Sequence, residues 1–248
     1  MVLETAFTPV TAIIGGAMIG LAALVLMWSV GRIAGISGIV AGAILEAEDE
    51  RNWRLLFLAG LFIGALIASV ITGALDDVSS IASTPVLIVA GLLVGIGTRM
   101  GGGGTSLAWR GCMKPWFIGL AGALFGAGIT VSGMANPAKV QNFLNVAGSW
   151  DPSLALVMGA ALLVVTPGFF FLFKMSAPKY AEAFALPTRK DIDWKLLLGA
   201  LLFGIGWALS GLCPAPALVA TLTGVSGFFI FLLAMVAGMI LYRFVFES

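Results

Sequence analysis

Four polar residues interrupt the long apolar segments of this chain at places where a helix must break. Ser210 and Cys213 lie in FGIGWALSGLCPAPA (203–217), and Asn136 and Lys139 lie in SGMANPAKV (132–140). Both stretches reach a proline, which ends a helix because it lacks a backbone donor. A thiol is a soft, weak donor, hydroxyl and amide groups add hydrogen bonds, and an ammonium attracts anions. This combination predicts that the breaks bind a small anionic solute.

Each of these residues also has a plainer interpretation. Cys213 could be a small buried hydrophobe, and Ser210 and Asn136, like Ser132, could simply satisfy backbone groups that lipid leaves without partners. Lys139 could be an interfacial lysine that extends its ammonium to water. Ionisable groups at membrane depth are functional hypotheses by default, however, so both interpretations stay open.

The composition restricts the chain to the class of polytopic membrane proteins. Of its 248 residues, 60% are hydrophobic and only 10% are charged, with a net charge of +1; soluble domains carry about 25% charged residues. The chain has no histidine, which excludes histidine-based metal sites and Ser-His-Asp or Cys-His catalysis. We expect no enzyme activity and no cofactor. The charges lie scattered in short loops, so we expect no nucleic-acid binding either.

Seven apolar segments are predicted as membrane crossings, which need roughly 20 residues; two of them, 85–97 and 196–210, are shorter and run into a glycine-rich break. The predicted crossings are Pro9–Trp28, Leu55–Thr72, Pro85–Gly97, Pro115–Ser132, Ser153–Phe173, Leu196–Ser210 and Ser226–Phe246. Up to four shorter, glycine-rich pieces are predicted as re-entrant half-helices, among them Ser29–Leu45 and Gly133–Gly148. The fold class is therefore all-α, in a single membrane domain that spans residues 1–248.

The distribution of lysine and arginine predicts the orientation, because basic residues collect in cytoplasmic loops. The only long hydrophilic loop, 174–195, holds five of the chain's 13 basic residues and is placed inside. Alternation then puts the C-terminus inside and the N-terminus outside, in a bacterial inner membrane. Arg32 and Arg99 fall on the inside, where they also fit as topology markers. Lys139 falls on the outside, where the inside bias does not explain it.

The broken segment recurs within the chain. FGAGITVSG (125–133) matches FGIGWALSG (203–211), VGIGTRMGGGG (94–104) is a third copy, and a looser fourth begins at Ile19. In this register Gly104 stands where Cys213 stands. The copies alternate in direction, which predicts an inverted repeat with half-repeats 1–111 and 112–248 and half-helices that meet near the midplane. The alternative is that the glycines only permit close helix packing.

Several of these stretches resemble the YeeE/YedE family of bacterial inner-membrane proteins. They are GRIAGISG (31–38), GLLVGIGTRMGGG (91–103), SGMANPAKVQNFLNV (132–146), SWDPSLALVMG (149–159) and GWALSGLCPAPAL (206–218). The resemblance implies an hourglass-like inverted-repeat fold and uptake of sulfur compounds such as thiosulfate. It further implies that cysteines in the re-entrant segments pass the anion along by S–H to sulfur hydrogen bonds.

One stretch departs from that family. After Gly104 the chain continues TSLAWRGCMKP, where the family has cysteines, a histidine and a further membrane helix. Gly104 occupies an expected cysteine position, and Met113 resembles a fresh chain start, as in relatives split over two genes, so a fusion is possible here. Only Cys213 carries over from the family's cysteine set, because Cys112 has no secure counterpart.

The sequence thus predicts a transporter or facilitator for a small sulfur-containing anion of the thiosulfate kind. Its expected binding residues are Cys213, Lys139, Asn136, Ser210 and the Gly104 turn. Two other functions stay open. One is a sulfur-transfer protein that uses Cys112 to hand sulfur to a soluble carrier protein. The other is a passive hourglass channel for small neutral solutes.

Overall fold

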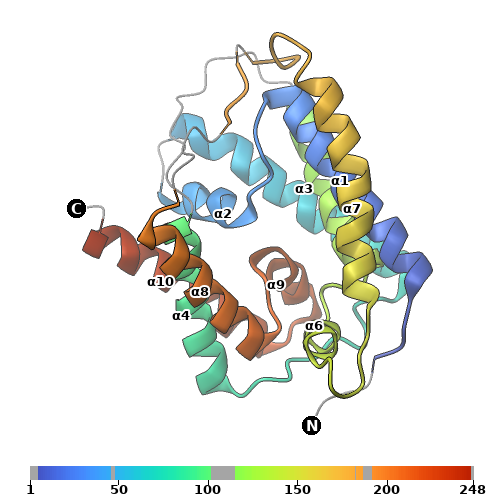
Figure 1. The fold of residues 1–248 in the computed structure, drawn as a ribbon, viewed down its shortest axis with the longest axis vertical. Coiled ribbons are helices and arrows are strands. Elements are labelled where there is room, and N and C mark those ends of the chain that lie inside the picture. Colours follow the sequence, from blue (N-terminus) through green and yellow to red (C-terminus); the bar gives the residue numbers. More distant parts are fainter. Residues whose placement is uncertain (1–4, 46–47, 102–114, 182, 187–191, 247–248) are drawn as a thin grey trace.

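The computed structural model describes residues 5–45, 48–101, 115–181, 183–186 and 192–246. These residues fold into helices joined by turns and loops (Figure 1). The helices are α1 (Pro9–Val30), α2 (Ile36–Leu45), α3 (Glu48–Thr72), α4 (Thr84–Gly101), α5 (Pro115–Val131), α6 (Pro137–Leu144), α7 (Ser153–Leu172), α8 (Trp194–Ser210), α9 (Pro214–Ala220) and α10 (Ser226–Phe246), with a 3-10 turn η1 (Thr221–Thr223).

Each predicted crossing coincides with a helix, and the chain is an all-helical, multi-pass membrane protein. Among the described residues, six helical segments are long and apolar enough to span a bilayer. They belong to α1, α3, α4, α7, α8 and α10, where the α8 segment continues through α9 and η1 to residue 223. The remaining predicted crossing is α5, an apolar helix of 17 residues, which lies at the lower limit of membrane length.

The long helices pack in two groups. In one group α1 contacts both α5 and α7, and α5 also contacts α3; in the other α4 contacts both α8 and α10. Glycines let these backbones approach closely, as small residues do between membrane helices. A methyl group at Gly15 would lie 2.5 Å from the backbone oxygen of Gly128, and one at Gly97 would lie 2.6 Å from that of Gly199. Some of the glycines therefore allow close packing of helices, and others, described next, end helices.

Four of the described long helices end at a glycine in the left-handed conformation, which a residue without a β-carbon adopts at little cost, and a short helix follows three of them. Gly31 follows α1 with φ 69°, Gly133 follows α5 with φ 71°, and Gly211 follows α8 with φ 69°. A short helix begins a few residues later in each case: α2, α6 and α9. The predicted breaks after these helices are thus present. The fourth, at 101–104, runs beyond Gly101 outside the described residues.

The short helices occupy different places. α9 lies in the middle of the bundle, in contact with α2, α3, α5 and α10, and most of its residues are buried (Figure 1). α6 lies at one end, against α7 and near the N-terminal segment (Figure 1). At the opposite end, the loop after α7 covers the end of α1, where Ala185 donates its N–H to the carbonyl of Gly31 at 2.8 Å.

Candidate functional site

The break between α8 and α9 is built on Ser210 and Gly211. The Ser210 hydroxyl donates back to the carbonyl of Gly206 at 2.9 Å and accepts the backbone N–H of Leu212 at 3.2 Å. Gly211 donates its N–H to the carbonyl of Trp207 at 2.8 Å. Ser210 is fully buried (1% exposed). Ser210 therefore satisfies backbone groups that the break frees, which was the plainer interpretation of this serine. It lies three residues before Cys213.

Cys213 is the residue that precedes α9. Its backbone is extended (φ −96°, ψ 159°), and Pro214 starts the helix at the position where a missing N–H costs nothing. Among the described residues the Cys213 thiol caps no N–H of α9 and is a free, partly exposed cysteine. The break thus presents a thiol that takes no part in ending or starting a helix.

The break between α5 and α6 repeats the same local structure. The Ser132 hydroxyl donates to the carbonyl of Ile129 at 3.0 Å and accepts the N–H of Met134 at 3.4 Å. Asn136 then takes the place of Cys213 as the extended residue before a proline. Its side-chain oxygen accepts the N–H of Ala138 at 3.0 Å, a standard helix cap. The side-chain oxygen of Asn136 is therefore engaged by α6, and the expected role of Asn136 in solute binding stays a prediction.

The two breaks touch each other. A methyl group at Gly211 would lie 2.7 Å from the backbone oxygen of Pro137 and 3.3 Å from the side chain of Gln141. Because Pro137 and Gln141 are four residues apart, they share one face of α6, and this face meets the end of α8. Residues that are far apart in sequence but matched in pattern thus form one structural unit.

Lys139 lies on the other side of α6, since it is two residues from both Pro137 and Gln141. Its ammonium donates a hydrogen bond to the hydroxyl of Thr8, and its side chain packs beside Gly133, where a methyl group would lie 3.2 Å from Cε. Burial lowers the pKa of Lys139, and the negative charge of Asp151 opposes this shift. The structure therefore places Lys139 near the α5–α6 break, facing the N-terminal segment.

Asp151 anchors a polar network at this end of the molecule. The carboxylate is buried (3% exposed) and accepts the Thr5 hydroxyl at 2.7 Å and the Ser153 hydroxyl and N–H at 2.6 and 2.9 Å. Asn142 donates to the Thr5 hydroxyl at 3.0 Å. Burial alone would raise the pKa of Asp151, but these hydrogen bonds and the charge of Lys139 lower it below 3.8. The sequence placed Asp151 only within the stretch SWDPSLALVMG (149–159).

Trp207 is a second feature that the sequence did not single out. Its indole N–H is buried and has no hydrogen-bond acceptor among the described residues. Trp207 lies one helical turn before Gly211, whose N–H bonds to its carbonyl. A buried donor without an acceptor is costly and calls for an explanation. The indole N–H of Trp207 is therefore a candidate donor to a bound solute.

Basic residues gather at the other end of α1. The guanidinium of Arg32 lies 5.0 Å from the Trp53 ring centre and that of Arg54 lies 5.2 Å away, within cation–π range. Both arginines are buried, 8% and 5% exposed, and Arg54 packs over Gly42 of α2. Arg32 is therefore packed into the protein beside Trp53 and does not lie in an exposed loop.

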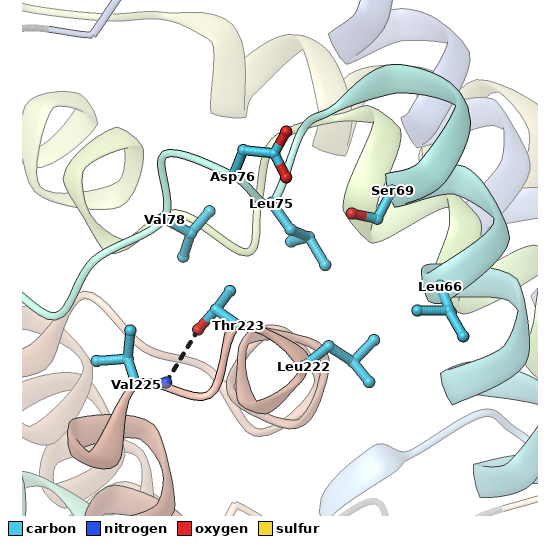
Figure 2. Close-up of a pocket in the computed structure, with 8 residues that line it drawn as sticks. All are labelled: Leu66, Ser69, Leu75, Asp76, Val78, Leu222, Thr223 and Val225. Carbon is cyan, nitrogen blue, oxygen red and sulfur yellow. Dashed lines mark hydrogen bonds between the residues drawn. The ribbon is translucent and has the colours of Figure 1, made fainter.

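A cavity of about 420 Å³ lies near the far end of α9 from Cys213 (Figure 2). It is a partly open hollow bordered by the end of α3, the turn around Asp76 and the η1 segment, with Leu66, Ser69, Leu75, Val78, Leu222, Thr223 and Val225 in its wall. The Asp76 carboxylate beside it disfavours an anion. The cavity therefore gives no support to an anion site, and the breaks remain the better candidate.

Gly104 and Cys112 lie outside the described residues. Within the described ranges, no group of three or more Asp, Glu or Cys side chains gathers that could hold a metal ion.

Comparison with known proteins places the chain in a family. Residues 113–248, more than half of the chain, match the family of unknown function DUF6691. A probable transporter of Xylella fastidiosa strain Temecula1 is 46% identical over 123 residues, which cover 49% of this chain and 83% of the relative. Strain 9a5c has a similar relative, 46% identical over 123 residues (84% of the relative). A further Temecula1 probable transporter is 46% identical over 94 residues, 38% of this chain and 68% of the relative. No solved structure matches. The chain belongs to the DUF6691 family.

Proposed function

We propose that this chain is a membrane transporter or facilitator for a small sulfur-containing anion of the thiosulfate kind. The observation that carries the proposal is the contact of Gly211 with Pro137, which joins two matched helix breaks next to the free thiol of Cys213. Broken helices that meet inside a membrane protein are the usual construction of a transporter's solute site. The relatives named probable transporters support the same class of function.

The architecture that we propose is an inverted repeat with re-entrant short helices. A long helix, a left-handed glycine, a short helix and a second long helix recur as α1–α2–α3, α5–α6–α7 and α8–α9–α10. Gly16 and Gly20 of α1 face Val157 and Ala161 of α7, so these helices run parallel. By the same criterion α5 runs parallel to α3 and antiparallel to α1. The start of the family match at residue 113 supports the division into 1–111 and 112–248.

In this proposal Cys213 and Trp207 bind the solute directly. Cys213 is a free cysteine at the α8–α9 break, and the buried indole N–H of Trp207 has no acceptor among the described residues. A divalent oxo-sulfur anion can accept both, and a soft terminal sulfur suits the polarisable thiol. Ser210 and Asn136 hold the two breaks in shape, and the glycine turns bring the backbones together.

In this proposal, basic residues near the two ends of α1 attract the anion on each side of the membrane. Lys139 lies at the end that we place outside, and the Arg32–Arg54 cluster lies at the end that we place in the cytoplasm. A 22-residue helix separates them, which is about 33 Å. In this orientation the N-terminus is outside and the C-terminus inside a bacterial inner membrane, with Lys139 at the outer end of α1 and the two arginines at its inner end. The proposal contains no catalytic step.

A growth experiment tests the function in a cell. A bacterial strain without other sulfate and thiosulfate uptake should grow on thiosulfate as its sole sulfur source when it expresses this chain. An empty vector and the variant with Gly211→Leu, which would force the two breaks apart, should not support growth. Restored growth on cysteine in all three strains serves as the viability control. Failure to grow on thiosulfate with the protein present in the membrane would contradict the proposal.

A further inference from the structure

The long helices form two groups, each of which is closely packed inside. Group one consists of α1, α3, α5 and α7, and group two consists of α4, α8 and α10. In group one, a methyl group at Gly20 would lie 2.9 Å from the backbone oxygen of Ala161; in group two, one at Gly91 would lie 2.6 Å from that of Phe231. Close-packed interiors of this kind do not deform continuously. Each group is therefore built as one rigid body.

The contacts between the two groups run through the three short helices. α2 contacts α3 of group one and α4 of group two, and α6 contacts α7 and α8 in the same way. α9 contacts α3 and α5 on one side and α10 on the other, and it lies between the groups (Figure 1). Among the described residues, no long helix of one group packs along a long helix of the other. The two groups thus meet along a seam that short helices fill.

The hollow of Figure 2 lies in this seam. Leu66 and Ser69 of α3 border it from group one, and Leu222 of η1 and Val225, the residue before α10, border it from group two. Figure 2 shows Leu66 and Leu222 facing each other across it. The hollow lies at the end of α3 that our orientation places outside. Packing therefore leaves the seam partly open at its outer end.

The inner end of the seam is filled by α2, which contacts both α3 and α4. Ile39 and Val40 of α2 are buried there, with 2% and 6% of their surface exposed. α2 directly follows the end of α1 that we place in the cytoplasm. The structure thus shows a seam that is open towards the outside and closed by apolar side chains towards the inside.

Two left-handed glycines lie next to the hollow in the chain. Gly73 follows α3 with φ 66°, and Gly224 precedes α10 with φ 75°. Leu75 and Asp76 in the wall of the hollow come just after the first glycine, and Val225 comes just after the second. Nothing lies within 4 Å of a methyl group placed on Gly224. Small loop residues of this kind absorb the backbone rotation when packed bodies move.

We infer that the two helix groups move against each other as rigid bodies about the short helices, so that the hollow closes outside while the seam opens inside. A solute site in the seam is then reached from one side of the membrane at a time, as alternating access requires. Cys213 directly precedes α9, the helix that lies in the seam. The inference rests on the proposed function for its solute, but the motion itself can be measured without any solute.

Distances between two spin labels test the motion. Labels at Leu163 of α7 and Leu233 of α10 span the seam, whereas Leu163 with Val70 of α3, and Leu233 with Leu197 of α8, are the matched pairs within one group. These four side chains are 62% to 81% exposed, and p-acetylphenylalanine carries the labels so that both cysteines stay in place. Double electron–electron resonance in lipid nanodiscs should show two distances across the seam and a single one within each group.

Addition of thiosulfate should shift the balance between the two distances across the seam and leave the pairs within a group unchanged. A single distance across the seam, as narrow as those within the groups and unaffected by thiosulfate, would overturn the inference. Two distances whose balance does not respond to thiosulfate would support the motion and count against the proposed solute.

A metal-ion lock tests whether the motion carries the solute. The chain has no histidine, so Leu66→His combined with Leu222→His supplies two imidazoles on opposite walls of the hollow, which Zn²⁺ can bridge when the hollow closes. Zn²⁺ should abolish thiosulfate uptake by this double variant, and a chelator should restore it. Each single variant should keep its uptake in Zn²⁺, because one histidine cannot join the two groups.

The lock has two outcomes that would overturn the inference. Unchanged uptake with one Zn²⁺ bound by each double variant would show that transport does not need the motion. Failure of the pair to bind Zn²⁺ would show that the two walls never come within reach of one ion. Absence of uptake by the unaltered chain would contradict the proposed function alone, and the spin-label distances would then decide the inference.

Discussion

Gly211, the left-handed residue that ends α8, lies against the backbone oxygen of Pro137, the first residue of α6. No side chain larger than hydrogen fits between them. This contact fixes the distance between two helix breaks that share one local structure, a buried serine, a left-handed glycine and a proline-led short helix. In the proposed function it also fixes Cys213 relative to the neighbouring break, so the geometry of the solute site depends on it.

Gly211→Ala should destabilise the protein more than a left-handed glycine alone would explain. The backbone strain costs about 1–2 kcal/mol, and the clash with Pro137 adds a cost on the order of 1–3 kcal/mol. Gly224→Ala is the matched control, because Gly224 has a similar φ of 75° but open space around it. Unfolding midpoints in detergent should rank unaltered chain, then Gly224→Ala, then Gly211→Ala. Equal losses in the two variants would show that the contact contributes nothing.

Cys213 can be tested with two substitutions that separate binding from packing. If the thiol donates to the anion, Cys213→Ala should abolish uptake, and Cys213→Ser should retain a part of it, because a hydroxyl still donates. A small buried hydrophobe would give the reverse order, since alanine preserves an apolar contact and serine introduces an unsatisfied hydroxyl. The comparison is the initial rate of uptake at equal protein in the membrane, and the reverse order would remove Cys213 from the mechanism.

Trp207→Phe should lower the apparent affinity for the anion and leave the free energy of unfolding unchanged or higher. The substitution keeps most of the aromatic ring and removes an N–H that has no acceptor among the described residues. Loss of one hydrogen bond to a charged ligand corresponds to about 1.5–3 kcal/mol, or roughly ten- to a hundredfold in affinity. Trp194→Phe at the exposed start of α8 is the control. An unchanged concentration dependence of uptake would rule out the indole as a ligand.

The Asp151 network predicts a specific dependence of stability on pH. The folded pKa of Asp151 is lower than 3.8, so the unfolded state binds more protons between the two values. The stability contributed by Asp151 is present above pH 3.8 and is lost as pH falls through the folded pKa. Asp151→Asn should therefore be less stable at neutral pH, by about 1–3 kcal/mol.

The difference between Asp151→Asn and the unaltered chain should shrink as the solution is acidified below pH 3.8. Asp76→Asn serves as the control, because Asp76 is exposed and its replacement should change little. Thermal unfolding at several pH values between 2.5 and 7 provides the measurement. A constant difference across this range would show that the ionised carboxylate does not stabilise this end of the molecule.

The helices and breaks could be predicted from sequence because their causes are local. A run of apolar residues of membrane length specified α1, and the pairs Ser132–Gly133 and Ser210–Gly211 marked breaks that proline then enforced. The match of 94–97 with 203–206 was read as a repeat, and the contact between α4 and α8, on which these residues lie, was not predicted.

The polar sites could not be predicted from the sequence, because they depend on residues that are distant in the chain. Thr5 and Asp151 are 146 residues apart, yet they share a hydrogen bond, and no spacing pattern encodes that contact. The unsatisfied N–H of Trp207 is a property of its surroundings, which composition does not reveal. Lys139 was identified correctly as a residue beside a break, but the direction of its side chain follows from the packing of Pro137 and Gln141 on α8.

Uptake of labelled thiosulfate into proteoliposomes that contain only this protein tests the central claim most directly. We predict uptake above that of protein-free liposomes and loss of uptake with Cys213→Ala. Unlabelled thiosulfate should compete, and sulfate should compete more weakly, because it lacks the soft terminal sulfur. Absence of uptake in folded, correctly reconstituted protein would contradict the account. So would flux of neutral solutes that equals the flux of the anion and does not respond to the membrane potential.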